Sequence, residues 1–528
     1  MKKRINLWKM PAISSYQGLL LLFLFAQPVL DIYRIFVDDA VELFGFSIPE
    51  LINMAMIAWI AILFVIRYLH NRKVMIFLSV YGTALVAYLV AHCWNILQFD
   101  GSIITGSEIN VVRELYFILR VYLIPMIYFF CLMTEKMDGS IFEKGTKILA
   151  GFISGVVVLS NVLGIGFITY ASTLEINDFI SRTIFDWFTN PDIYYPSHMS
   201  CKGWFYTGNQ ISMILFMLFP FVLRSAFKSQ TPGNYGLVLL QTVAMLMVGT
   251  KVASLGAVLI IAASVVIYFI FALAKKRPVI NKKAVTALVC AVLLVAVLFP
   301  FSPVIAIQIE REEAGDTSVE YAEQGKDALA DILEEVEDSD PGDTEEEAEW
   351  SEEAIRKFVN NLNQYHNSYG ISKAFIDMFS VENNVYFWRD VVMDEEQTQL
   401  DYREFKQVIY QEVLRKNDNP ADRWLGIGYT SNFIYAEKDG LGQVIWFGYV
   451  GTLLLLGPYL ACVAYIIFRV LKKIKVAFCY ENAFFAISLL GSLLLSLMAG
   501  HLFYGVFSII VFVWLLAGTY HFQFALEE

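Results

Sequence analysis

Three clusters of polar, glycine and aromatic residues have the composition of sites that bind anions or sugars. The first runs from Lys202 to Gln210 and contains two glycines as well as Asn209. Glycines let backbone amides approach an anion, and the side chains of Asn and Gln can hydrogen-bond a sugar or a phosphate. The alternative is that Trp204 and Tyr206 form part of an aromatic belt at a membrane surface. The cluster is a candidate substrate-binding segment.

The second cluster places Lys251 directly after Gly249 and Thr250, in a turn between two apolar segments. A lysine in such a turn can bind an anion. Alternatively, its long stem lies along the apolar surface while its charge reaches water.

The third cluster lies before the last apolar segments of the chain. It begins at Arg423 and includes a glycine turn that ends at Tyr429. It continues through the acids Glu437 and Asp439 to a glycine-rich helix start over 447–451. The sequence therefore brings a tight turn, two acids and a helix that re-enters an apolar region together on one face.

Ionisable residues inside apolar spans are hypotheses for functional sites. Asp31 and Arg34 are three residues apart on one helix, where they form either a structural ion pair or part of a site. Glu114 opens another span and is a candidate binding residue. His92 and His501 lie near helix ends, and a lone histidine there is more often a satisfied interfacial residue than a catalyst.

The elements that position these residues are transmembrane helices. The chain has 528 residues, of which 57% are hydrophobic and only 17% charged. A soluble domain is closer to one quarter charged, and a helix that crosses a bilayer needs about 20 apolar residues. We therefore predict an all-α integral membrane protein with about twelve transmembrane helices. They lie near residues 15–37, 48–67, 74–94, 113–133, 147–170, 204–225, 235–250, 252–274, 283–305, 442–470, 483–500 and 502–520.

The short loops predict the orientation, because cytoplasmic loops carry an excess of lysine and arginine. With this count of spans, the N-terminus and every second loop lie on one side of the membrane, and the basic residues are found there. The opposite loops are acidic or polar. Both termini are thus expected in the cytoplasm. The basic residues are Lys2, Lys3, Arg4, Arg67, Arg72, Lys73, Lys136, Lys144, Lys147, Arg224, Lys228, Lys275, Lys276, Arg277, Lys282, Lys283, Arg469, Lys472, Lys473 and Lys475.

The expected organisation has three parts. Residues 1–307 form an N-terminal bundle of nine helices, 308–440 a large extracytoplasmic loop, and 441–528 the last three helices. Within the loop, the run from Asp331 to Glu353 contains no lysine or arginine, so it is expected to repel itself and be mobile. The later stretches 351–365 and 402–414 have apolar residues at helical spacing.

Composition also excludes several classes of function. The sequence contains no basic patch of the kind that binds a nucleic acid and no His/Glu spacing of the kind that binds a metal ion. We therefore expect no nucleic-acid partner, no metal and no cofactor. The six cysteines form no CxxC pair and are interpreted as small core residues. The N-terminal Met1-Lys2-Lys3-Arg4 before a long apolar run indicates a retained first helix rather than a cleaved signal peptide.

This arrangement resembles the O-antigen ligase and O-antigen polymerase membrane family, with its relatives that build Gram-positive cell-surface polysaccharides. The resemblance covers nearly the whole chain, with twelve spans and a large outer loop between the ninth and tenth. The motifs that carry it are Gly203-Trp204-Phe205 with Gly208-Asn209-Gln210, Gly249-Thr250-Lys251, Trp388-Arg389-Asp390, Leu425-Gly426-Ile427-Gly428-Tyr429 and Phe447-Gly448-Tyr449-Val450-Gly451.

The resemblance implies a protein of the bacterial cell membrane that takes a glycan from undecaprenyl diphosphate and passes it to an acceptor hydroxyl. Its partners would be the lipid-linked glycan, the acceptor glycan, the bilayer and other polysaccharide-assembly proteins. Neither a nucleotide sugar nor a metal is required in the family's ligases. Cations must neutralise the leaving diphosphate. Lys251 and Arg389 are the first candidates, with Lys202 and Arg423 behind them, while Asn209, Gln210 and Tyr429 would bind substrate.

The acceptor hydroxyl needs a general base. Ligases of the family carry a histidine shortly before the final Gly-x-x-Gly, and Glu437 occupies about that place here, with Asp439 two residues on. The chain has no histidine between His366 and His501. Either a carboxylate takes the role of the base or base catalysis matters less, which favours the polymerase-like or Gram-positive branch. Alternatively, Glu437 is a solvated loop acid.

Two other functions are consistent with the helices. A transporter or flippase for a lipid-linked or anionic substrate would often show internal repeats and broken helices at mid-membrane, and we find no repeat. A non-catalytic sensor or assembly protein would suit the acidic loop but leaves the clusters at Lys251 and Arg389 unexplained.

Overall fold

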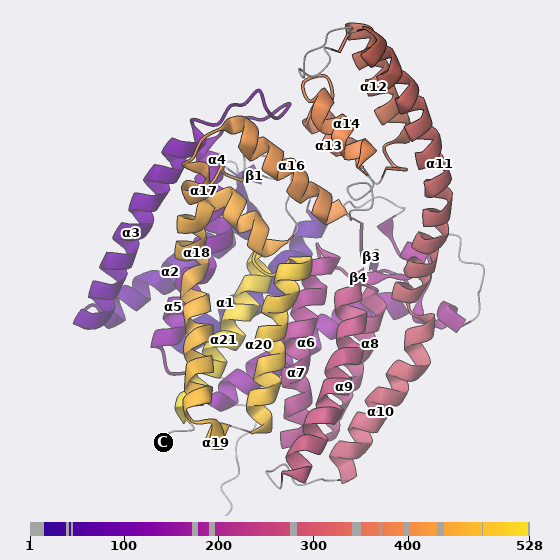
Figure 1. Ribbon diagram of the computed structural model, residues 1–528. Coiled ribbons are helices and arrows are strands. Elements are labelled where there is room, and N and C mark those ends of the chain that lie inside the picture. The colour runs from indigo at the N-terminus through magenta and orange to yellow at the C-terminus, as the bar shows by residue number, and fades with distance from the viewer. Residues whose placement is uncertain are drawn as a thin grey trace, which may run out of the picture. The chain divides into compact units, whose positions relative to one another are not determined.

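The computed structural model is built almost entirely of helices (Figure 1). It describes residues 15–37, 42–43, 46–171, 178–188, 196–274, 282–339, 350–369, 371–394, 402–429, 438–477 and 479–525. Within these residues the strands form two short antiparallel pairs. Strand β1 (Glu42–Leu43) pairs with β2 (Phe46–Ser47), and β3 (Phe167–Ile168) pairs with β4 (Cys201–Gly203). The predicted all-helical membrane fold is confirmed.

The chain divides into two compact units. Unit 1 comprises Met1–Thr83, Phe117–Gln308 and Leu453–Glu528, and unit 2 comprises Ala84–Tyr116 and Ile309–Thr452. The helices that contribute to unit 1 are α1 (Tyr16–Phe36), α2 (Ile48–Tyr68), α3 (Arg72–Ile96), the π-helix η1 (Leu119–Leu123), α5 (Ile124–Thr134), α6 (Gly139–Val162), the 3-10 helices η3 (Ile184–Phe188) and η4 (Pro196–Met199), α7 (Gly208–Lys228), α8 (Pro232–Val248), α9 (Lys251–Leu273), α10 (Lys282–Leu298), the 3-10 helix η5 (Phe299–Phe301), α18 (Asp439–Lys472), α19 (Ile474–Ala477), α20 (Tyr480–Ala499) and α21 (Val506–Ala525).

Helix α7 is the centre of unit 1. Every residue from Ile211 to Phe227 is buried, and the helix packs against α6, α8, α9, α20 and α21. A helix that is apolar all round is expected to be enclosed by its neighbours in this way. The packing therefore fixes both ends of α7, which begins beside the first sequence cluster.

The apolar helices have the lengths that a bilayer requires. Ten described helices have at least 18 residues and the hydropathy to cross a membrane, and two shorter apolar helices, Pro232–Val248 and Val506–Phe522, join them. A bilayer core corresponds to about 20 helical residues, with a range of about 17–25. The chain is a multi-pass membrane protein, and the count of twelve spans stays a prediction.

The fifth predicted span, 147–170, is wrong at both ends. Helix α6 begins at Gly139, because the side chain of Asp138 caps it by accepting a hydrogen bond of 2.7 Å from the backbone N–H of Ser140. The helix ends at Val162, and Gly164 then takes a left-handed conformation with φ of 68°. Apolar residues continue into strand β3, which is why hydropathy alone extends the span too far.

Most of a long helix, α11 (Pro303–Ser339), belongs to unit 2, and the predicted boundary between bundle and loop falls inside this helix. The helix runs for 37 residues without a break at position 308, where the sequence analysis ends the bundle. The prediction of a mobile run is wrong for 331–339, because Ile332 and Val336 are buried together with Ala354. Residues 340–349 of the run lie outside the described residues.

The remaining helices of unit 2 confirm the two predicted helical stretches of the loop. Their apolar positions form a core: Phe358 and Leu362 are buried on α12, as are Phe405 and Ile409 on α16. These helices are α4 (Val111–Ile118), α12 (Glu352–Tyr365), α13 (Lys373–Met378), α14 (Val385–Met393), α16 (Tyr402–Asn417) and α17 (Asp422–Leu425).

Candidate functional site

The side chain of Lys202 organises the first cluster from inside unit 1. Lys202 is 0% exposed, and its ammonium group donates to the backbone carbonyls of Ala171 and Tyr206. Burial lowers the pKa of Lys202 to about 8, although the carboxylates of Asp31 and Asp178 act in the opposite direction. Lys202 thus closes the loop between β4 and α7, and its charge is directed at the protein's own backbone.

Asp31 and Arg34 of α1 both contact Tyr206. The carboxylate of Asp31 accepts a hydrogen bond of 2.9 Å from the backbone N–H of Tyr206. The guanidinium carbon of Arg34 lies 4.2 Å from the centre of the Tyr206 ring. The two side chains, which the sequence analysis expects to form either a structural ion pair or part of a site, thus hold the loop before α7 in place.

The pH dependence of stability should reveal the burial of Lys202. Between about pH 8 and its unfolded pKa near 10.4, the unfolded chain binds a proton at Lys202 that the folded chain has released. Stability therefore rises with pH in this window through this group and is flat below about pH 8. Relative to a Lys202→Met variant, wild type should gain roughly 1.5 kcal/mol between about pH 8 and about pH 9.5 in thermal unfolding. A stability difference that stays constant over this range would contradict the assignment.

Asn209 and Gln210 begin α7 and reach the turn between α20 and α21. The amide nitrogen of Asn209 lies 3.2 Å from Nε2 of His501, and that of Gln210 lies 3.5 Å from the hydroxyl of Ser508. His501 has a φ of 71°, a left-handed conformation that is costly for a residue with a side chain and that clusters at functional sites. The sequence expectation of a satisfied histidine agrees with its contact to Asn209, whereas its strained backbone has no sequence signal.

Lys251 occupies the N-terminal end of α9. Gly249 ends α8 with φ of 70°, and Thr250 caps α9 by accepting from the N–H of Ala253 at 3.1 Å. The hydroxyl of Thr250 also donates to Ser212 of α7 at 2.7 Å. Lys251 itself is exposed. A lysine at the positive end of a helix is a site where an anion is stabilised by both charge and backbone N–H groups.

Residues around β3 connect these parts of unit 1. The hydroxyl of Thr169 donates to the carbonyl of Val248 at 2.6 Å, just before the Lys251 turn. A Cβ atom at Gly208 would overlap the backbone of Thr169, so the start of α7 needs glycine for this close approach. The structure thus brings the predicted residues Lys202, Asn209, Gln210 and Lys251 to one end of unit 1.

In unit 2 the two glycine motifs pack backbone against backbone. The N–H groups of Ile427 and Gly428 donate to the carbonyls of Ile445 and Trp446, at 3.0 and 2.9 Å. Helix α18 is interrupted at Gly448, whose φ of 66° and ψ of −179° are not helical. This kink is where the two motifs meet.

A buried acid and a buried histidine hold the motif that ends at Tyr429. Glu114 and His92 are each 0% exposed, and Nε2 of His92 lies 3.2 Å from Oε1 of Glu114. Nδ1 of His92 lies 2.6 Å from the carbonyl of Leu425, and the carboxylate of Glu114 accepts from the backbone N–H of Tyr429 at 2.9 and 3.0 Å. His92 and Glu114 therefore both contact the turn at 425–429 and each other.

Removing this acid should destabilise unit 2. Glu114→Ala deletes the acceptor shared by His92 and the Tyr429 amide, and breaking a buried pair of this kind costs roughly 3–5 kcal/mol. The measurement is the thermal unfolding temperature of the detergent-solubilised protein. Glu108→Ala is the matched control, since Glu108 is an exposed carboxylate in the preceding loop. Equal unfolding temperatures for the two variants would show that the pair carries no stability.

Asn95 and Asp422 support the same turn from its other side. The amide nitrogen of Asn95 donates to Asp422 at 2.8 Å and to the carbonyl of Gly426 at 2.9 Å. Burial raises the pKa of the Asp422 carboxyl. Sequence reasoning did not find Asn95, Asp422 or the His92–Glu114 contact, because the partners lie far apart in the chain.

The other predicted site residues belong to unit 2. Arg389 on α14 pairs with its neighbour Asp390 at 2.7 Å, and Arg423 on α17 is exposed. Asp439 is buried and is the first residue of α18. Glu437 lies outside the described residues. Among the described residues, no group of three His, Cys, Asp or Glu side chains could hold a metal ion.

The geometry can be compared with known proteins. The family model of O-antigen ligase like membrane proteins matches residues 14–520. The chain belongs to this family. No curated protein and no solved structure matches the chain. Membership makes the chain a membrane protein of the glycan ligase and polymerase type. The clusters at Lys251, Tyr429 and Gly448 therefore lie in an O-antigen ligase like membrane protein.

Proposed function

We propose that the chain transfers a glycan from undecaprenyl diphosphate to the hydroxyl of an acceptor sugar during the synthesis of a cell-surface polysaccharide. The observation that carries the proposal is the family match over residues 14–520. The exposed Lys251 at the start of α9 supports it, because a diphosphate needs a fixed cation where the helix N–H groups also point.

In the proposed reaction the acceptor oxygen attacks the anomeric carbon of the donor sugar. A new carbon–oxygen bond forms, the bond from that carbon to the diphosphate oxygen breaks, and undecaprenyl diphosphate leaves with the bonding electrons. Lys251 is proposed to bind the diphosphate, whose charge grows as the bond breaks, and Arg389 and Arg423 stay further candidates for this role. Arg389 would exchange part of its contact with Asp390 for the phosphate.

The proton of the acceptor hydroxyl goes to a carboxylate, Glu437 or Asp439, in the proposed mechanism. Asp439 is buried and is the first residue of α18, and Glu437 precedes it by two residues. Asn209, Gln210 and Tyr429 are proposed to bind the sugars. Lys202 is proposed to contribute indirectly, by holding the loop that places Asn209 and Gln210.

The proposed location is the bacterial cell membrane, with both termini in the cytoplasm and the large loop outside. The donor is then met at the outer surface, and other polysaccharide-assembly proteins are proposed partners. The acceptor glycan would approach from the loop side.

A transfer assay tests the proposal directly. The purified protein is mixed with a glycan on undecaprenyl diphosphate and an acceptor glycan, and the released lipid diphosphate and elongated glycan are measured. In cells, an Arg389→Ala or Asp439→Asn variant should accumulate the lipid-linked donor on the outer leaflet and lose polymer. Donor trapped on the inner leaflet would instead indicate a flippase. Full polymer in both variants and in Lys251→Ala would refute the site assignment.

A further inference from the structure

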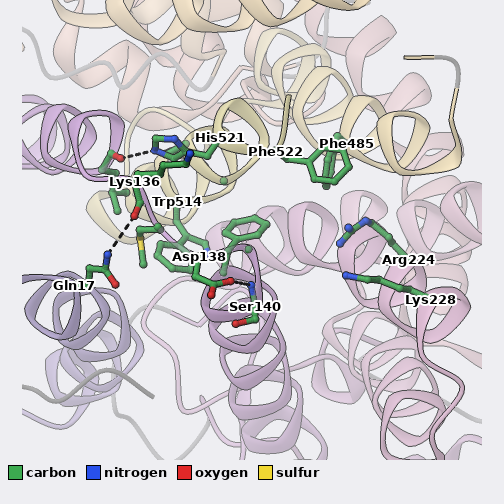
Figure 2. A pocket seen from close by; sticks show the side chains of 16 residues that line it. Gln17, Lys136, Asp138, Ser140, Arg224, Lys228, Phe485, Trp514, His521 and Phe522 are labelled. Carbon is green, nitrogen blue, oxygen red and sulfur yellow. Dashed lines mark hydrogen bonds between the residues drawn. The ribbon is translucent and has the colours of Figure 1, made fainter. Parts of the chain in front are cut away.

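A cavity of about 620 Å³ lies in unit 1 among the ends of α5, α7 and α21 and the beginnings of α6 and α20 (Figure 2). Three cationic side chains and one carboxylate line it: Lys136, Arg224, Lys228 and Asp138. This end of the helices carries the basic loops that we expect in the cytoplasm. Within unit 1, the cavity is therefore separate from Asn209, Gln210 and Lys251, which lie at the opposite ends of α7 and α8.

Arg224 is a buried cation in the wall of this cavity. The residue is 5% exposed and lines the cavity, yet its Nε forms no hydrogen bond within the described residues. Burying a polar group without a partner costs roughly 1–3 kcal/mol, and more for a charged group. The guanidinium carbon lies 5.1 and 5.5 Å from the ring centres of Phe485 and Phe522, which hold it against an aromatic wall. Arg224 is thus a mostly buried cation in the wall of the cavity, where an anion would stabilise its charge.

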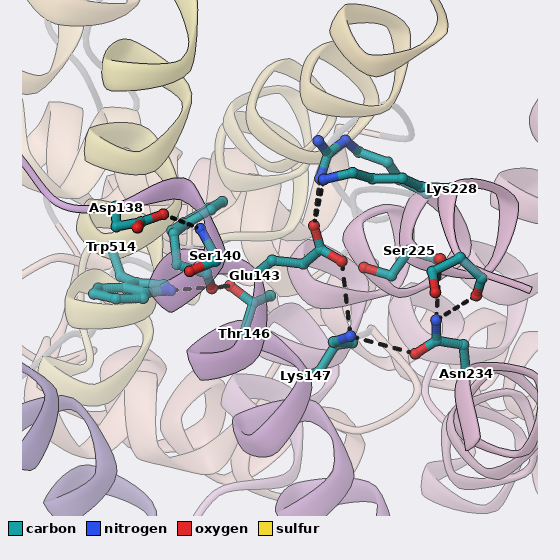
Figure 3. A network of polar contacts seen from close by, with 12 residues as sticks. Asp138, Ser140, Glu143, Thr146, Lys147, Ser225, Lys228, Asn234 and Trp514 are labelled. Carbon is teal, nitrogen blue, oxygen red and sulfur yellow. Dashed lines mark hydrogen bonds and ion pairs between the residues drawn. The ribbon is translucent and has the colours of Figure 1, made fainter. Parts of the chain in front are cut away.

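The acids nearby leave an excess of positive charge. Glu143 faces Lys228 at 2.8 Å, Lys147 at 3.7 Å and Arg224 at 4.0 Å, so one carboxylate serves three cations (Figure 3). The carboxylate of Asp138 accepts from the N–H of Ser140 at 2.7 Å. An incoming anion therefore meets cations that one carboxylate only partly neutralises.

The walls of the cavity also suit a molecule with an apolar part. Trp514, Phe485 and Phe522 line it beside the cations. Figure 2 shows Arg224 and Lys228 next to each other, with Phe485 close to them. An arginine, a lysine and aromatic rings form the combination that recognises a phosphate group attached to an apolar body.

We propose that this cavity binds a phosphate group, with Arg224 and Lys228 as its main ligands. The phosphate can come from a phospholipid of the adjacent leaflet or from a soluble phosphate compound, and the two sources are separated by experiment. The proposal is independent of glycan transfer, because none of these residues takes part in the proposed reaction.

Binding is measured on the full-length protein purified in detergent and stripped of lipid. Thermal unfolding is followed during titration with phosphatidylglycerol, with diacylglycerol, which lacks the phosphate, and with inorganic phosphate. Phosphatidylglycerol should raise the unfolding temperature and diacylglycerol should not. Stabilisation by inorganic phosphate alone would support the site with a soluble compound as its ligand.

Variants connect the binding to the cavity. Arg224→Gln and Lys228→Gln should each weaken phosphatidylglycerol binding by roughly tenfold to a hundredfold, as expected for the loss of a hydrogen bond to a charged group. Lys147→Gln is the matched control, since Lys147 contacts Glu143 but does not line the cavity. If Arg224→Gln fails to fold, Lys228→Gln still tests the proposal. The Lys228 side chain is half exposed, so its replacement is expected to leave the fold intact. Equal affinity of wild type and Lys228→Gln, or equal stabilisation by diacylglycerol, would overturn the proposal.

Discussion

Replacing Gly448 by alanine is expected to destabilise unit 2 by more than about 3 kcal/mol. A φ of 66° with a ψ of −179° is a conformation that essentially only glycine adopts, which costs another residue roughly 1–3 kcal/mol. In addition, a Cβ atom at position 448 would overlap the backbone of Trp424 and Leu425. The backbone cannot move away without losing the hydrogen bonds from Ile427 to Ile445 and from Gly428 to Trp446. Alanine therefore brings two penalties at one point.

The matched control is Gly457→Ala on the same helix α18. A Cβ atom there lies 3.4 Å from the flexible side chain of Leu453, an ordinary contact, and alanine favours a helix by up to about 1 kcal/mol over glycine. The yield of folded protein in membranes and the unfolding temperature in detergent are the measurements. Gly426→Ala should behave like Gly448→Ala, since its Cβ atom would overlap the backbone of Trp446. If Gly448→Ala unfolds at the temperature of Gly457→Ala, the backbone contact is not as described.

The second large effect is expected at Lys251. Under the proposed function, Lys251→Ala should slow glycan transfer by roughly 100- to 1,000-fold, the range found when one fixed donor is removed from a developing negative charge. Because the charge on the diphosphate grows toward the transition state, kcat and kcat/KM should fall together. The transfer assay with purified protein gives both parameters.

Two further variants separate charge from structure at this position. Lys251→Arg keeps the cation and should retain most of the activity, whereas Lys251→Met keeps the apolar stem and should behave like alanine. Neither change should alter the unfolding temperature much, since the side chain is exposed and the cap is made by Thr250. Wild-type rates in Lys251→Ala would leave the lysine with only a role at the membrane surface.

The helices could largely be predicted because their signal is local. A run of about 20 apolar residues is sufficient to indicate a span, and the helical stretches 351–365 and 402–414 follow from the spacing of residues such as Phe358 and Ile409. The errors have local causes as well. A capping side chain at Asp138 and a left-handed Gly164 set the ends of α6, and hydropathy averages do not register either one.

The site could be predicted in part only. Glycines and cations at 249–251 are visible in the sequence, and the structure places them at the junction of α8 and α9. The burial of Lys202 was not visible, because it depends on carbonyl groups at Ala171 and Tyr206 that the fold supplies. The same holds for His92 and Glu114, whose significance comes from their common contact with the distant turn at 425–429.

The shortness of α8 has a consequence for the depth of the Lys251 turn. Its 17 residues rise about 26 Å, against about 30 Å for the hydrocarbon core. If α8 starts at one boundary of the hydrocarbon core near Thr231, its other end stops about 4 Å short of the opposite boundary, so Gly249 and Lys251 lie just inside the core. The phosphates of a carrier lipid lie just above that level, among the head groups. The long stem of Lys251 can then lie along the apolar surface while its ammonium group reaches the phosphates, and the carrier's tail remains inside the membrane.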